Sequence, residues 1–456
     1  MAARTRNREI MGTEDVRTLI PRMALPTIVA QIIMTVYSLV DTFFVSQLGK
    51  AATAAVGVNS SIERTINMFA MLIGAGACSF IARLLGADRK DEADQVMSTS
   101  VFTSFMVGLL ILVLGKIFLS PLVDFMGANA ECKQYSMEYG TYVLLAAPFM
   151  ICSFVFNMCL RSEGSATYAM IGMGAGGILN CFLDPLFIFG LNLGVAGASM
   201  ATAISKFVSF VILLIPYLRK KTLVTIAWKN IRYKAEHIKE VISIGMASFM
   251  RAGLSVVATI CMNRAAGAYS TAVLAAISVS NRIMMFPFSI ILGFGQGYQP
   301  VAGYNWGARK YSRVRESYTF SMKIAVIGGI IMGAVIIILA RPLIGLFNSE
   351  ADADLFYYGC MTLRFEAAAL FMHALGTVVN MFYAGIGRPR EALICSTSRQ
   401  GYCLIPLIFI LPLFMGVIGL CVAQFAADVL ALFIAVPLGI KAYRMVKSKE
   451  EAAAAL

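Results

Sequence analysis

The stretch from Gly164 to Ser205 decides the fold; it reads GSATYAMIGMGAGGILNCFLDPLFIFGLNLGVAGASMATAIS. Asp184 is its one charged residue. An α-helix needs about 20 apolar residues to cross a hydrocarbon core of about 30 Å. The stretch therefore predicts parts of two membrane spans, 166–190 and 196–218, with a carboxylate held inside the first of them.

The same pattern recurs along the whole chain. Of its 456 residues, 59% are hydrophobic and 14% are charged, and the mean hydropathy is +0.77. Soluble domains carry roughly 25% charged residues. We predict an all-α membrane protein with no sizeable soluble domain and twelve spans, at 17–46, 52–82, 94–117, 133–159, 166–190, 196–218, 238–263, 272–303, 315–340, 354–385, 391–414 and 418–443.

The net charge of +13 has a topological explanation. On this helix assignment, 26 Lys and Arg residues lie at the termini and in the connections of one side, and 5 lie in the connections of the other side. Basic loops stay in the cytoplasm. We therefore expect a multi-pass protein of the cytoplasmic (inner) membrane with both termini cytoplasmic, a retained first helix rather than a cleaved signal peptide, and no nucleic-acid partner.

The two halves of the chain resemble each other weakly. An offset near 218 pairs Gly49 with Gly267 and Arg64 with Arg282, although chance matches between glycine-rich helices are an alternative. We expect an N-terminal six-helix lobe (1–218), a cytoplasmic linker (219–239) and a C-terminal six-helix lobe (240–456). Because six is an even number, the pseudo-two-fold axis between the lobes should run along the membrane normal, which encloses a cavity between them.

Two aspartates interrupt long apolar runs. Asp41 follows the charge-free segment Met23–Val40, and Asp184 lies in the stretch above. A carboxylate at membrane depth costs roughly 2.5–3.5 kcal/mol on insertion scales, so it persists where it faces a cavity and a cation. Structural alternatives remain, in which each aspartate caps a helix break or pairs with a basic residue such as Lys206.

Helical spacing adds further oxygen ligands to these two carboxylates. Asn180 is four residues before Asp184, so the two share one helix face. With Thr202, these residues supply hard oxygen ligands for a hard cation. Adjacent carboxylates also disfavour double ionisation, so a proton could replace the metal ion. The corresponding positions of the second half are Thr259 and Ile405, so we expect the buried carboxylates in the N-terminal lobe only.

Other membrane-depth features are less specific. Pro26 removes a backbone hydrogen bond early in the first helix and is a candidate gate, although a static kink is an alternative. The 27 methionines suit a cavity wall that repacks around varied apolar ligands. In the second lobe, Arg399 is expected to form a structural pair with Asp428 or Glu366. The polar candidates of that lobe are Gln296, His373, Asn380, Arg399 and Asp428.

Motifs for enzymatic chemistry are not found. The sequence has no Walker-type phosphate loop and no His-Glu-x-x-His zinc motif, and its cysteines lack metal-site spacing. We expect no enzyme activity, no cofactor and no resident metal ion. Transport would draw its energy from a gradient of protons or sodium ions.

The segment from Arg161-Ser-Glu-Gly164 through Asn180-Cys-Phe-Leu-Asp184-Pro185 to Ala201-Thr202 resembles the most recognisable stretch of multidrug and toxic compound extrusion (MATE) transporters. Val40-Asp41-Thr-Phe-Phe and Ser398-Arg399-Gln400 resemble the bacterial and archaeal drug-exporter branch near the DNA-damage-inducible subgroup. The resemblance implies a two-lobe antiporter that exchanges protons or sodium ions for amphipathic, often cationic compounds by alternating access. It implies an N-lobe coupling site of Asp41, Asn180, Asp184 and Thr202, and a substrate cavity lined by Tyr37, Tyr139, Asn157 and Met173.

One departure from the family pattern concerns the C-terminal lobe. Some branches carry acidic residues in helices seven, eight or ten, whereas helix seven here offers Arg251 and no acid at membrane depth. This difference moves the expected coupling site to the N-terminal lobe. The alternatives are a flippase of the same superfamily for lipid-linked precursors, or an uncoupled channel-like protein. We expect a monomer in the lipid bilayer.

Overall fold

The structure is a computed structural model that describes residues 10–128, 130–347 and 352–455. Within these ranges it is all-helical. Eleven helices are long and apolar enough to cross a membrane, and a pair bent by 44° adds one more, which makes twelve spans. The predicted fold class is therefore confirmed, and the predicted spans agree with the observed helices to within a few residues at most ends.

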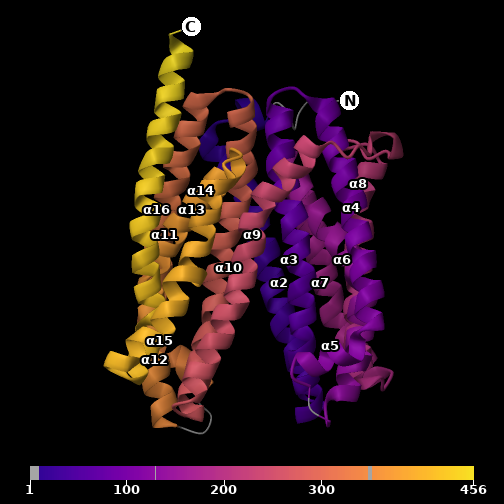
Figure 1. The fold of residues 1–456 in the computed structure, drawn as a ribbon, viewed down its shortest axis with the longest axis vertical. Helices are drawn as coiled ribbons and strands as arrows, with labels where there is room; N and C mark the ends of the chain where they lie inside the picture. The colour runs from indigo at the N-terminus through magenta and orange to yellow at the C-terminus, as the bar shows by residue number, and fades with distance from the viewer. Residues whose placement is uncertain (1–9, 129, 348–351, 456) are drawn as a thin grey trace.

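The helices form two bundles that stand side by side (Figure 1). We call the first bundle the N-lobe. It contains α2 (Val16–Ser46), α3 (Lys50–Gly86), α4 (Lys90–Ile117), the short α5 (Leu119–Phe125), α6 (Lys133–Ser162), α7 (Ala166–Pro185) continued by the π-helical turn η1 (Leu186–Gly190), and α8 (Gly194–Leu218).

A linker with the short 3-10 helix η2 (Trp228–Asn230) leads to the second bundle, the C-lobe. The C-lobe contains α9 (Ala235–Gly267), α10 (Thr271–Gly307), α11 (Tyr311–Gly345), the bent pair α12 (Ala353–Ala368) and α13 (Leu370–Gly385), then α14 (Pro389–Thr397), the π-helical segment η3 (Ser398–Cys403), α15 (Leu404–Met415) and α16 (Val417–Ala454).

Local sequence explains several helix ends. The Asp15 side chain accepts a hydrogen bond from the Arg17 amide at the start of α2, and the Ser270 side chain accepts one from the Val273 amide at the start of α10. Pro185 has no amide hydrogen, and the regular α-helix gives way to η1 immediately after it. This irregular turn begins two residues after Asp184.

The lobes meet through α2, α3, α9 and α10, where glycines let backbones approach closely. A Cβ atom on Gly245 of α9 would lie 1.7 Å from the Leu72 carbonyl oxygen of α3. A Cβ atom on Gly76 of α3 would lie 1.9 Å from the Val241 carbonyl oxygen of α9. Gly86 and Gly307 make equally close contacts nearer the ends of α3 and α10. These contacts lie in the half of the molecule that contains the termini (Figure 1).

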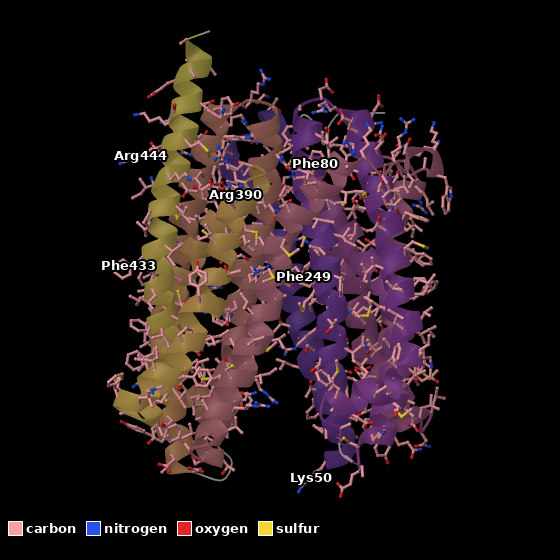
Figure 2. The ribbon with its side chains drawn as sticks, in the orientation of Figure 1. Lys50, Phe80, Phe249, Arg390, Phe433 and Arg444 are labelled. Atoms are coloured by element: carbon pink, nitrogen blue, oxygen red, sulfur yellow. The ribbon has the colours of Figure 1, made fainter. Side chains whose placement is uncertain are left out.

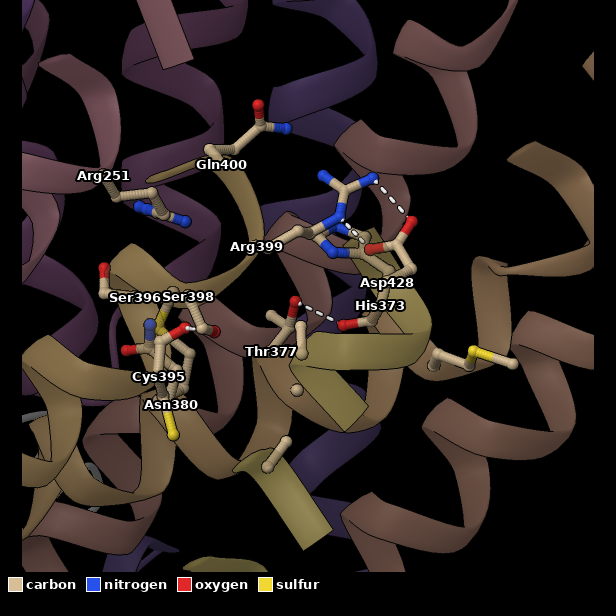
Figure 3. A pocket seen from close by; sticks show the side chains of 15 residues that line it. Arg251, His373, Thr377, Asn380, Cys395, Ser396, Ser398, Arg399, Gln400 and Asp428 are labelled. Carbon is tan, nitrogen blue, oxygen red and sulfur yellow. Dashed lines mark hydrogen bonds and ion pairs between the residues drawn. The ribbon is translucent and has the colours of Figure 1, made fainter. Parts of the chain in front are cut away.

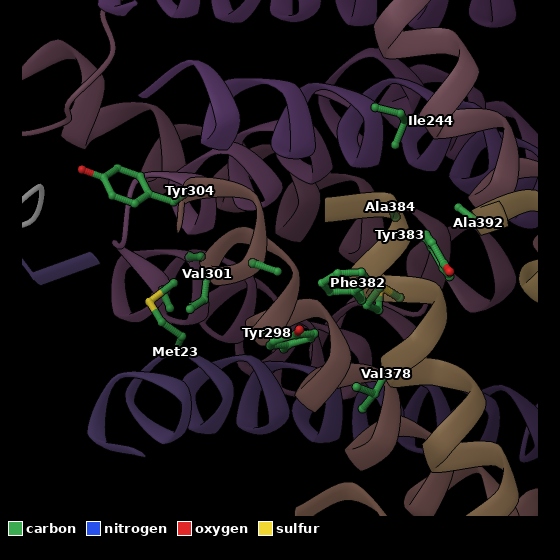
Figure 4. Packing of buried hydrophobic residues seen from close by; sticks show 14 of the residues in the cluster. Met23, Ile244, Tyr298, Val301, Tyr304, Val378, Phe382, Tyr383, Ala384 and Ala392 are labelled. Carbon is green, nitrogen blue, oxygen red and sulfur yellow. The ribbon is translucent and has the colours of Figure 1, made fainter. Parts of the chain in front are cut away.

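The core lies where α3, α10 and α13 pack against one another. Tyr298, Phe382 and Tyr383 are among the largest fully buried side chains, and Figure 4 shows them with Val301 and Val378. Apolar side chains also cover the outer surface, as expected in lipid. Phe433, 72% exposed, lies midway along the molecule, whereas Arg444 lies toward the terminal end and Lys50 at the opposite end (Figure 2).

Candidate functional site

Asp41 and Asp184 come together in the N-lobe, from α2 and α7 respectively. Asp41 is 8% exposed and Asp184 is 0% exposed, and the two carboxylates interact electrostatically. Asp41 Oδ1 and both oxygens of Asp184 have no hydrogen-bond partner of normal geometry among the described residues. The Asn180 amide group lies close to Asp184. Buried carboxylate oxygens are costly unless they are paired, so this site is suited to a cation or a proton.

The remaining predicted coupling residues also lie at this site. Asn180 Nδ2 donates a hydrogen bond of 3.3 Å to Thr202 Oγ1, which joins α7 to α8. Asn180 Oδ1 is a further buried oxygen without a partner. Tyr37 lies beside both Thr202 and Asp41. The structure thus brings Asp41, Asn180, Asp184 and Thr202 into one cluster; helical spacing predicted the pairing of Asn180 with Asp184, and the family resemblance implied the full set.

One residue of this cluster, Glu63, was missed in the sequence, and Lys206 was considered there only as a structural partner of an aspartate. Glu63 of α3 accepts a hydrogen bond of 3.5 Å from the Tyr139 hydroxyl and interacts electrostatically with Asp41. Lys206 of α8 interacts with both Glu63 and Asp41, and its Nζ lies 5.0 Å from the centroid of the Tyr37 ring. Glu63 lies within the predicted span 52–82, so the rule that selected Asp41 could have found it. Glu63 was not selected because Arg64 follows it in the sequence, and an acid next to a base suggests a solvent-exposed pair.

The cluster contains more acid than base. Lys206 acts on Asp41 and Glu63, and the exposed Arg64 acts on Glu63 as well, so three acids face two bases and the site can take up a further positive charge. The described residues hold no group of three or more His, Cys, Asp or Glu arranged around a metal ion. A bound sodium ion would therefore depend on the amide and hydroxyl oxygens of Asn180 and Thr202 as well.

The predicted substrate-cavity residues separate into two places. Tyr37 and Tyr139 belong to the acidic cluster. Asn157 and Met173 line a different, small cavity of the N-lobe, together with Arg161 and with Gln296 from the C-lobe.

Gln296 lies on α10 of the C-lobe, as predicted, but its contacts are with the other lobe. Its Oε1 accepts hydrogen bonds from Arg161 Nη1 at 2.7 Å and from Gln31 Nε2 at 2.9 Å. Both donors belong to the N-lobe, so Gln296 joins the lobes and is not part of a C-lobe cluster. Pro26, the predicted gate, lies inside α2, which continues through it without interruption.

The other C-lobe candidates do gather. His373, Asn380, Arg399 and Asp428 line one cavity of about 70 Å³ (Figure 3). Arg399 pairs with Asp428 as predicted, with Nε donating to Oδ1 and Nη2 donating to Oδ2 at 3.3 Å. Asp428 and Glu366 are 3% and 6% exposed. The expectation of buried carboxylates in the N-lobe only was therefore wrong, because the Arg399 charge allows Asp428 to be buried.

The chain was compared with known proteins. The family model MatE matches residues 26–186 and again residues 247–410, once in each half. The chain is 27% identical to the multidrug export protein MepA of Staphylococcus haemolyticus over 90% of both chains, and 28% identical to MepA of Staphylococcus aureus over 87% of both.

One similar solved structure is the outward-facing conformation of a multidrug resistance MATE family transporter of the MOP superfamily. It has a TM-score of 0.90 and 27% identity, and the match covers 95% of this chain and 97% of that one. With the family model matched in both halves, the chain belongs to the MATE family of membrane transporters.

Proposed function

We propose that this protein is a secondary active multidrug efflux transporter, which exchanges protons or sodium ions for amphipathic, often cationic compounds. One observation carries the proposal. Three carboxylate oxygens of Asp41 and Asp184 are buried in the N-lobe without a hydrogen-bond partner of normal geometry among the described residues. The names of the curated relatives, multidrug export proteins, support the same class of function.

The negative charge of the acidic cluster explains why a coupling ion would be exchanged for a cationic compound. A cationic compound and a coupling ion would both be stabilised by the acidic cluster, so each would lower the affinity of the site for the other. This coupling is reciprocal, because the two binding free energies are linked. Protonation of the carboxylates, or sodium bound by them, would release a cationic compound. Loss of the ion would restore the attraction between the carboxylates and a cationic compound.

The close contacts between the lobes support alternating access. The glycine contacts of α3 with α9 and of α3 with α10 occupy the terminal half of the molecule, which the charge bias assigns to the cytoplasm. A conformation closed on that side would receive coupling ions from outside. The reverse conformation would require these contacts to separate, and Pro26 could permit α2 to bend as they do.

The proposal can be tested in cells and in vesicles. Expression in a host without its own drug pumps should raise resistance to a lipophilic cation such as ethidium, and inverted membrane vesicles should accumulate it when a gradient is imposed. A flippase for lipid-linked precursors would leave ethidium resistance unchanged. An uncoupled channel would equilibrate ethidium but would not concentrate it.

A further inference from the structure

The cavity of the C-lobe contains a cation without a counter-charge. Arg251 of α9 lines it, and the guanidinium group makes no hydrogen bond or ion pair with any described residue and has no acidic side chain acting on it. Arg251 lies midway along α9, about 24 Å from either end at 1.5 Å per residue. That distance exceeds the reach of the side chain, so the charge cannot extend to the membrane surface.

The other charged groups at the cavity do not neutralise Arg251. Arg399 is paired with Asp428, and its guanidinium carbon lies 4.7 Å from the centroid of the Phe288 ring. His373 packs edge-on against the same ring at 5.1 Å. Glu366 interacts electrostatically with Arg399 and Asp428 but does not line the cavity. The cavity therefore carries one unpaired positive charge.

Its free hydrogen-bonding groups include the donors that an oxyanion needs. The hydroxyl groups of Thr377, Ser396 and Ser398 already donate to backbone carbonyl oxygens. Asn380 and Gln400 make no hydrogen bond with a described residue, so their amide groups remain available in the cavity that Arg251 lines. Figure 3 shows Arg251 and Gln400 at the part of the cavity opposite Asp428. A guanidinium fork with two amides can bind both oxygens of a carboxylate.

The size of the cavity also restricts the ligand. Its volume of about 70 Å³ is more than the roughly 10–15 Å³ that a cavity needs to hold one water molecule, and less than the roughly 300–1,000 Å³ of pockets for whole drug-sized ligands. It is therefore suited to one functional group of a larger compound.

We propose that the Arg251 cavity binds the carboxylate of an amphipathic, zwitterionic substrate. The acidic cluster of the N-lobe would bind the cationic part of the same compound, so the two lobes would divide recognition by charge. This inference rests on the proposed efflux function and assigns the Arg251 cavity a part in the recognition of compounds that carry both charges. A small inorganic anion is the other source of the same chemistry, and the experiment separates the two.

Two related dyes test the proposal, because rhodamine 123 is the methyl ester of rhodamine 110 and lacks only its free carboxylate. Export would be measured with the full-length protein in proteoliposomes. Arg251→Gln should lower export of rhodamine 110 about tenfold or more, since a hydrogen bond to a charged group is lost. Export of rhodamine 123 should stay within about twofold of wild type. Arg251→Lys should retain more rhodamine 110 export than Arg251→Gln, because it keeps the charge.

Controls distinguish this role from a structural one. Arg264→Gln, at an exposed position of the same helix, should leave both dyes unaffected. Gln400→Ala removes one amide and no charge, so it should reduce only rhodamine 110 export. This variant keeps the proposal testable if Arg251→Gln fails to fold. Equal losses for both dyes in Gln400→Ala and in a folded Arg251→Gln would overturn the proposal, as would no loss for either dye.

Export of the two dyes by the wild-type protein distinguishes the remaining outcomes. If it exported neither dye, the proposed efflux function itself would fail. If it exported rhodamine 123 but not rhodamine 110, efflux would stand and the carboxylate site would be wrong. Replacement of chloride and phosphate by the larger anion isethionate should not change rhodamine 123 export. An Arg251-dependent loss in that buffer would assign the cavity to an inorganic anion instead.

Discussion

At the scale of single residues, the N-lobe carboxylates act as one unit. Asp41 and Asp184 interact electrostatically, and Asn180 and Thr202 complete the same cluster. Substitutions that remove one shared site are not additive, because the second finds little left to remove. We predict that Asp41→Asn and Asp184→Asn each abolish gradient-driven ethidium efflux, and that the double variant lies within about twofold of either single variant.

Membrane insertion and thermal stability should remain near wild type in these variants, since each substitution replaces a buried carboxylate with a neutral group. Thr259→Ala and Ile405→Ala, at the corresponding positions of the C-lobe, serve as matched controls and should transport normally. Initial efflux rates from the same proteoliposome preparation would measure all five proteins. Full efflux in both aspartate variants would place the coupling site elsewhere, around Arg399 and Asp428 first.

Glu163 has a different role, outside the membrane spans. It lies between α6 and α7, is fully buried, and accepts hydrogen bonds from the Tyr217 hydroxyl at 3.1 Å and from the amides of Leu223 and Val224. These bonds attach the linker to the N-lobe. Burial raises the pKa of Glu163 to about 8, although the three donors oppose this shift.

The raised pKa of Glu163 predicts a pH dependence. A carboxyl with a higher pKa in the folded protein stabilises it fully below the unfolded pKa of about 4.5, and this contribution is lost as pH rises through about 8. The thermal midpoint should therefore fall between pH 6 and pH 9. Glu163→Gln should remove most of that fall, whereas Glu236→Gln, at an exposed position, should keep it. An unchanged pH dependence in Glu163→Gln would show that another group titrates.

At the scale of helices, hydropathy and charge were enough to locate the spans. The predicted span 238–263 is observed as Ala235–Gly267, and 272–303 as Thr271–Gly307. The ends extend by a few residues because polar residues outside the lipid continue the helix. The bend between α12 and α13 was missed, since no proline or glycine marks Ala369.

The candidate site was only partly predictable for a related reason. Spacing along one helix joined Asn180 to Asp184, but nothing local linked Glu63 to Asp41, and Lys206 entered only as one possible structural partner. Nor did spacing show that Gln296 contacts Arg161 across the lobes. Contacts between distant helices depend on packing that a single sequence does not display.

The contact between α3 and α9 gives a prediction of its own. Gly245→Ala would place a methyl carbon 1.7 Å from the Leu72 carbonyl oxygen, so the helices must separate. Overpacking of this kind costs about 1–3 kcal/mol. We expect a lower thermal midpoint and greater opening of the terminal side, measured as the distance between spin labels on α3 and α9. Gly57→Ala, in open space on α3, should change neither. A wild-type distance in Gly245→Ala would mean that this contact does not hold the lobes together.

At the scale of the whole molecule, the two termini and the linker lie on one side (Figure 1). The charge bias assigns that side to the cytoplasm. In a cysteine-free background, Lys229→Cys should react with a membrane-impermeant maleimide only after the cells are permeabilised. Glu131→Cys, between α5 and α6, should react in intact cells. The reverse pattern would invert the orientation of the protein.

The central claim is that the acidic cluster of the N-lobe couples an ion gradient to efflux. The most direct measurement is ethidium transport by purified protein in proteoliposomes, with proton and sodium gradients imposed separately, for the wild type and Asp41→Asn. The account predicts that one of the two gradients accelerates wild-type transport and that neither accelerates Asp41→Asn. Gradient-driven transport by Asp41→Asn at the wild-type rate would contradict it.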